Sequence, residues 1–140
     1  MKRGKIAIFT MSYSLSGAEK RFIRIASQIK QYRDDILLII NYELYKAALS
    51  DNELKHTVLR MKNENSLFLL NNKPKPNKIN RIVGNLYNLY KILKVNNVKI
   101  LHCSLSTLKY TFIKKFLNVK ILAEITSPDV ALDLIDPKKY

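Results

Sequence analysis

The feature that most limits how this chain folds is a regular alternation of short apolar runs with segments of helical period. Residues 6–11 and 36–40 form nearly continuous apolar runs, which are typical of strands covered on both faces. Between these runs, residues 18–32 carry apolar side chains at the three- and four-residue spacing of an amphipathic helix. The alternation predicts an α/β fold with a parallel sheet and right-handed crossovers.

The pattern assigns most of the chain to strands or helices. The expected strands are residues 6–11, 36–40, 56–61, 98–103 and 119–125, while residues 66–72 are apolar but ambiguous. The expected helices are residues 18–32, 42–49, 79–96, 108–116 and 130–135. Ser106 or Thr107 is the expected N-cap of the helix at 108–116. Two prolines within residues 73–78 predict a surface connection there.

The helix at 79–96 is the strongest of these predictions. Its apolar side chains recur at helical spacing, with polar residues between them. The stripe expected to face the core consists of Ile79, Ile82, Val83, Leu86, Tyr90 and Leu93, with Leu89 and Ile92 widening it.

The expected architecture is a doubly wound parallel sheet of about five strands in the order 3-2-1-4-5, with helices on both faces. The first strand, residues 6–11, should be central. In such sheets ligands bind beyond the carboxyl ends of the strands, where the strand order reverses. That point falls between the first and fourth strands, so residues 11–17 and 103–107 are predicted to form the mouth of a site.

Composition narrows the class of protein. A chain of 140 residues suits a single domain, residues 1–140, and its 47% hydrophobic content excludes intrinsic disorder. The single cysteine, Cys103, excludes an internal disulfide and a four-cysteine zinc site, and we read it as buried filler rather than a nucleophile. The longest clean apolar run, 36–40, is far below the ~20 residues of a membrane span. We expect no metal, no cofactor and a cytoplasmic location.

The charge is strongly positive and uneven. The formal net charge is +14, and Glu64 is the only acidic residue between positions 55 and 120. Such a field attracts anionic partners such as phospholipid head groups, yet a solvated lysine-rich surface explains it equally well. No helix-turn-helix or zinc pattern is present, so no specific nucleic acid is expected. The residues predicted to contact an anionic membrane are Lys75, Lys78, Arg81, Lys91 and Lys94.

The loop before the first helix reads Ser16-Gly17-Ala18-Glu19-Lys20-Arg21. A glycine at a helix N-terminus lets backbone N–H groups approach a phosphate closely, and Lys20 or Arg21 adds positive charge. Alternatively, Gly17 only makes a tight turn and Glu19 offsets the helix dipole. The sequence leaves both interpretations open.

This loop, together with residues 5–9, 95–104 and 117–122, resembles the N-terminal domain of family 4 glycosyltransferases of the GT-B fold, in the order and spacing of its motifs. The resemblance implies a Rossmann-like domain that handles the sugar acceptor, followed by a second domain that binds the nucleotide-sugar. It implies no certain catalytic residue. The residues it marks as substrate-binding are Ser16, Gly17, Glu19, Arg21, His102 and Thr126.

Two of these residues carry their own alternatives. His102 ends the fourth strand, where it either hydrogen-bonds a sugar hydroxyl or phosphate or packs between strand and helix. Thr126 stands where the family often has a histidine, and it cannot transfer a proton near neutral pH.

The expected function is therefore the acceptor-binding N-terminal domain, or a fragment, of a retaining glycosyltransferase. The parent enzyme moves a sugar from a nucleotide-sugar to a glycan or lipid-linked acceptor, at the inner face of the membrane. The length leaves no room for the donor-binding domain, so the chain alone is expected to be inactive. The alternative is a stand-alone basic module that binds an anionic membrane or a phosphate-bearing polymer.

Overall fold

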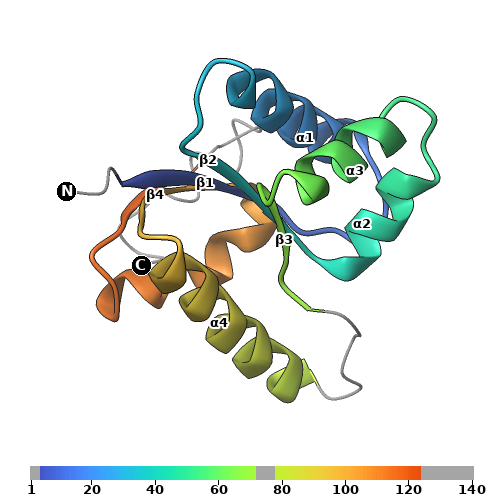
Figure 1. The fold of residues 1–140 in the computed structure, drawn as a ribbon. Coiled ribbons are helices and arrows are strands. Elements are labelled where there is room, and N and C mark those ends of the chain that lie inside the picture. The colour runs from blue at the N-terminus through green and yellow to red at the C-terminus, as the bar shows by residue number, and fades with distance from the viewer. Residues whose placement is uncertain (1–3, 72–77, 124–140) are drawn as a thin grey trace.

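The structure is a computed structural model that describes residues 4–71 and 78–123. Five parallel strands form one sheet in the order β3-β2-β1-β4-β5 (Figure 1). The strands are β1 (Lys5–Phe9), β2 (Ile36–Ile40), β3 (Leu67–Leu69), β4 (Val98–Cys103) and β5 (Lys120–Ala123). The predicted α/β fold, its strand order and the central place of the first strand are confirmed.

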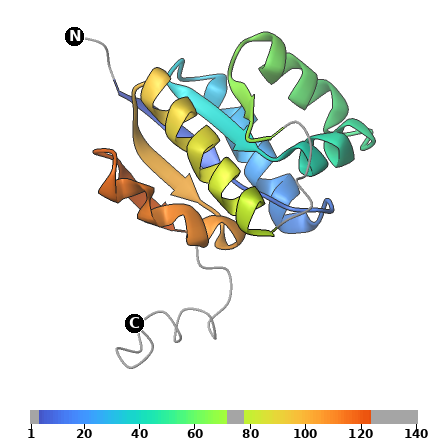
Figure 2. The ribbon, with the colours of Figure 1, turned by 90° about the horizontal axis from the view of Figure 1, so that it is seen from below.

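Helices cover both faces of the sheet. On one face lie α1 (Gly17–Lys30), α2 (Tyr42–Leu49) and α3 (Lys55–Asn63) (Figure 1). On the other face α4 (Lys78–Val95) runs beside a 3₁₀ helix, η1 (Leu105–Lys115), as Figure 2 shows. No helix among the described residues is long and apolar enough to cross a membrane.

Each face of the sheet has its own hydrophobic core, because side chains alternate along a strand. Ile8 and Leu38 pack with Phe22 under α1. Phe9 and Ile39 point the other way and pack with Leu89 of α4. This burial on both faces explains the continuous apolar runs of the central strands.

The predicted third strand was wrong. Residues 56–61 belong to the helix α3, and the strand lies in the ambiguous segment that follows, at Leu67–Leu69. Leu54, the N-cap of α3, is buried with Val58 and Met61 of the helix, while Leu59 is exposed, and this is helical spacing. The short apolar pair Val58-Leu59 was read as the centre of a strand, because six residues are too few to distinguish the two-residue period of a strand from the 3.6-residue period of a helix.

The predicted stripe on α4 was partly wrong. Ile79 and Val83 are 71% and 59% exposed, whereas Leu89 and Leu93 are buried as expected, together with the polar Asn85. Asn85 enters the core because its amide Nδ2 donates to the buried hydroxyl of Tyr110 at 3.0 Å. The hydrogen bond satisfies the buried amide, and this is why a polar residue is tolerated on the face of α4 that packs on the core.

The remaining boundaries agree closely with prediction at 36–40, 42–49 and 98–103. The helix after β4 begins earlier than expected, with Ser104 rather than Ser106 or Thr107 as its N-cap, and it is a 3₁₀ helix. Ser106 and Thr107 lie inside η1, and their hydroxyls bond to residues 9, 11 and 104. The predicted helix at 130–135, the end of the last strand and the proline-containing connection lie outside the described residues.

Candidate functional site

The carboxyl ends of β1 and β4 lie side by side, and the loops that follow them are bonded to each other. Phe9 pairs in register with Cys103. Beyond that pair, the hydroxyl of Ser106 donates to the carbonyl of Met11 at 2.7 Å and accepts its N–H at 3.4 Å. The hydroxyl of Ser104 lies 3.0 Å from that of Ser106. The two loops predicted to meet at the switch point therefore do meet, joined by serine side chains.

Asn41 fixes the β1–α1 loop from the end of the neighbouring strand, and sequence reasoning missed it. Its side chain is buried, accepts the N–H of Ser12 at 3.0 Å and donates to the carbonyl of Ser12 at 2.9 Å. It also donates to the carboxylate of Glu43 at 2.8 Å. The signal available in the sequence was an asparagine directly after the apolar run 36–40, at the same sheet edge as the predicted mouth.

Thr10 gives this edge an unused hydrogen-bonding group. It follows the last residue of β1 and is 1% exposed. Within the described part of the chain its hydroxyl has no hydrogen-bond partner. Buried hydroxyls are nearly always hydrogen-bonded. The hydroxyl of Thr10, at the carboxyl end of the central strand, can therefore still form a hydrogen bond.

The first turn of α1 carries several of the predicted site residues, and two of its charges are already engaged. The carboxylate of Glu19 accepts the N–H of Ser16 at 3.1 Å and its hydroxyl as well, which caps the helix. The ammonium of Lys20 lies 3.0 Å from the carboxylate of Asp51, and this hydrogen bond lowers the pKa of Asp51. Glu19 therefore caps the first turn of α1.

Gly17 leaves the start of α1 open. Its backbone has no positive φ, and a Cβ added there would meet no described atom within 4 Å. Neither backbone conformation nor packing among the described residues calls for glycine at this position. Gly17 is exposed and brings no side chain of its own to the first turn of α1.

His102 and Arg21 meet on one aromatic ring. His102 lies on the α1 side of β4, half-buried, with its ring 5.5 Å from that of Phe22 at an interplanar angle of 64°. The guanidinium carbon of the exposed Arg21 lies 5.4 Å from the centre of the same ring. The structure thus brings these two predicted site residues together around Phe22, while Thr126 lies outside the described residues.

The predicted membrane-facing cations divide into two places. Arg81 donates from Nη1 to the hydroxyl of Tyr13 at 3.1 Å, which places it beside the β1–α1 loop. Lys91 and Lys94 lie further along α4 with their ammonium groups over the rings of Tyr87 and Tyr90. Lys75 and the side chain of Lys78 lie outside what the structure describes.

Cys103 is expected to be inert toward alkylation in the folded protein. It is fully buried, and burial raises the pKa of its thiol to about 11, although a hydrogen bond with Thr107 partly opposes the shift. Because the thiolate is the reactive form, iodoacetamide at mildly alkaline pH should react at least about tenfold more slowly than with the chain unfolded in urea. Equal rates in the two states, followed by mass spectrometry, would contradict this.

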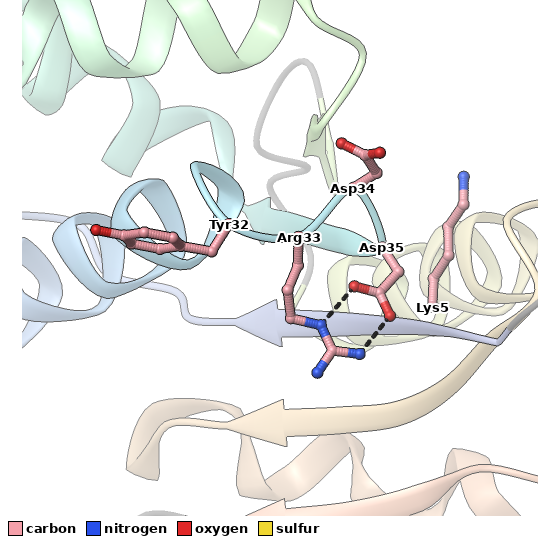
Figure 3. Close-up of a pocket in the computed structure, with 5 residues that line it drawn as sticks. All are labelled: Lys5, Tyr32, Arg33, Asp34 and Asp35. Atoms are coloured by element: carbon pink, nitrogen blue, oxygen red, sulfur yellow. Dashed lines mark hydrogen bonds and ion pairs between the residues drawn. The ribbon is translucent and has the colours of Figure 1, made fainter.

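A separate hollow of about 450 Å³ lies at the opposite edge of the sheet, at the amino ends of β1 and β2 (Figure 3). There Arg33 donates from Nε and Nη2 to the two carboxylate oxygens of Asp35, at 2.8 and 2.6 Å. This pairing raises the pKa of Arg33 and neutralises both charges. The described residues contain no cluster of three or more His, Cys, Asp or Glu that could hold a metal ion. The switch-point mouth is therefore the better candidate site.

The fold and these loops define a doubly wound α/β domain with a polar mouth at its switch point. The crystal structure of a glycosyltransferase from Rickettsia africae ESF-5 has the same fold, with a TM-score of 0.59 and 16% identity over 98% of this chain. The chain spans 34% of the length of that protein. No protein-family model and no curated protein sequence matches the chain.

Proposed function

We propose that this chain is the acceptor-binding N-terminal part of a family 4 glycosyltransferase of the GT-B fold, one that retains the configuration of the transferred sugar. The observation that carries the proposal is the fold shared with a known glycosyltransferase over nearly the whole chain, with the polar mouth at its switch point. The sequence motifs that resemble family 4 support the finer assignment. The partners would be a glycan or lipid-linked acceptor and a nucleotide-sugar donor, at the cytoplasmic face of the membrane.

The mouth offers groups suited to an acceptor rich in hydroxyls or carrying a phosphate. The open first turn of α1 presents backbone N–H groups and the positive end of a helix dipole. Arg21 adds a guanidinium cation, and His102 adds a hydrogen-bonding ring. In family 4 the nucleotide-sugar binds a second domain, so these residues would hold and orient the acceptor rather than perform the transfer.

The test is acceptor binding by the full chain and by its Gly17→Val variant, followed by NMR. Binding of a short prenyl-pyrophosphate sugar should shift backbone amides in residues 11–21 and 102–107. Because a side chain at position 17 meets open space, the variant should keep its thermal stability yet bind about tenfold more weakly, since its branched side chain blocks the approach. The matched control is Gln28→Val, at an exposed position near the other end of the same helix.

Two results would contradict the proposal. One is acceptor-induced shifts that map to another face of the sheet. The other is measurable sugar transfer by the purified 140-residue chain from any of a panel of nucleotide-sugars, because donor binding would then reside here. If Gly17→Val binds the acceptor with unchanged affinity, Gly17 is not part of the binding site and has only a structural role in the turn before α1.

A further inference from the structure

An apolar hollow of about 340 Å³ opens between α4 and η1, on the face of the sheet away from α1. It is lined by Leu86, Tyr87, Tyr90, Phe112, Ile113 and Phe116. Tyr87, Phe112 and Phe116 are 62%, 42% and 65% exposed, although their rings are among the largest apolar groups of the chain. The rings of Phe112 and Phe116 pack edge to face, with centres 6.2 Å apart. We call these lining residues the α4–η1 surface.

The apolar character continues along α4. Ile79, Val83 and Tyr87 are four residues apart, so they lie along one side of the helix, and all three are exposed. Single exposed hydrophobic residues are ordinary, but a contiguous apolar stripe that ends in an aromatic hollow is typical of an interaction surface.

Lysines surround the α4–η1 surface. Lys91 and Lys94 extend their ammonium groups to 5.4 and 5.5 Å from the ring centres of Tyr87 and Tyr90. Exposed lysines of η1 add further charge, and these are Lys109, Lys114 and Lys115. Residues 65–123 contain no Asp or Glu, so no acidic side chain in this stretch balances them. The apolar stems of these lysines lie over aromatic rings and their ammonium groups lie at the edge. The α4–η1 surface therefore has an apolar centre, the apolar floor, and a positively charged edge, the cationic border.

These features select one occupant. A second copy of the chain would set two identical cationic borders against each other. A nucleic acid is favoured by arginine forks, but no arginine follows Arg81 in the sequence. Lysines and tyrosines around an apolar floor suit the boundary between lipid head groups and acyl chains. We propose that the α4–η1 surface docks on anionic lipid bilayers, with Phe112 and Phe116 at the acyl boundary and the lysines among the head groups.

The first experiment is co-sedimentation of the full chain with vesicles of phosphatidylcholine alone or with an equal part of phosphatidylglycerol. Binding to the anionic vesicles should be at least about tenfold stronger and should weaken with salt. The double variant Phe112→Ser/Phe116→Ser should bind about tenfold more weakly, because it removes the apolar contact. Lys91→Gln/Lys94→Gln should also weaken binding about 25-fold, because each lysine contributes roughly fivefold.

The matched control is Lys55→Gln/Lys62→Gln, which removes the same charge from α3 on the opposite face of the sheet. It should change binding less than about twofold, because its lysines lie beyond a Debye length from the docked bilayer. Circular dichroism of each variant confirms the fold, and the substituted side chains are exposed. An equal loss in this control, equal binding to neutral vesicles, or unchanged binding without the two phenylalanines would each overturn the proposal.

A fluorescent reporter tests the orientation, since the chain contains no tryptophan. The emission of Phe112→Trp should shift to shorter wavelength on anionic vesicles, while that of Tyr32→Trp, in the turn after α1, should stay unchanged. Equal shifts at both positions would overturn the docking geometry. Dimerisation abolished by Phe112→Ser/Phe116→Ser would assign the surface to a second copy. Tighter binding to a single-stranded RNA oligonucleotide than to anionic vesicles, lost in the same variant, would assign it to nucleic acid.

Discussion

Replacing Phe9 with alanine is expected to lower the free energy of unfolding by about 3–5 kcal/mol, a large share of what a domain of this size has. Phe9 ends the central strand and is completely buried. The centre of its ring lies 5.8 Å from that of Tyr110, a buried residue of η1 in the same core. The variant loses the transfer free energy of the ring and leaves a cavity that neighbours on two sides cannot fill. Urea unfolding followed by circular dichroism gives the value.

The matched control is Phe116→Ala, the same change at a ring that is 65% exposed. It should cost less than about 1 kcal/mol, because little surface returns to water and no cavity forms. Similar losses in the two variants would show that the described packing around Phe9 does not hold the sheet and η1 together.

The central strands were predictable because burial on both faces leaves a continuous apolar run. Residues 36–40 were located to the residue for this reason. The edge strand β3 is only three residues long and half-buried over two of them. It therefore leaves a weaker pattern than the neighbouring helix, whose Val58 and Met61 compete for the same short window. In short edge strands and short helices, hydrophobic periodicity does not distinguish a strand from a helix.

The sequence was enough to predict which loops form the candidate site, but not the hydrogen bonds that hold those loops. The strand-end rule depends only on strand order, so it located the loops after β1 and β4. The groups that hold those loops are polar side chains bonded to distant backbone. Ser106 bonds Met11 across 95 positions, and Asn41 bonds Ser12 across 29. No local spacing encodes such pairs, and the same holds for Asn85 and Tyr110 in the core.

Replacing Asn41 with alanine is expected to cost about 2–3 kcal/mol of stability and to loosen the mouth. The side chain satisfies both the N–H and the carbonyl of Ser12, and its loss leaves two part-buried backbone groups unpaired. Amide hydrogen exchange should accelerate in residues 11–14 more than in the strands. Asn118→Ala, at an exposed asparagine, should cost less than about 0.5 kcal/mol. A uniform change in exchange would contradict a local pinning role.

Asn41→Asp separates hydrogen bonding from shape. Near neutral pH the new carboxylate still accepts the N–H of Ser12, but it cannot donate to the carbonyl and it lies beside the carboxylate of Glu43. We therefore expect it to be less stable than Asn41→Ala. Burial and the Glu43 charge raise the folded-state pKa of the introduced group above its unfolded value. Its stability relative to wild type should consequently rise as pH falls from about 7 to about 5, because protonation restores a donor toward Ser12. A gap that does not narrow with acid, in urea unfolding at each pH, would show that Asn41 acts by shape alone.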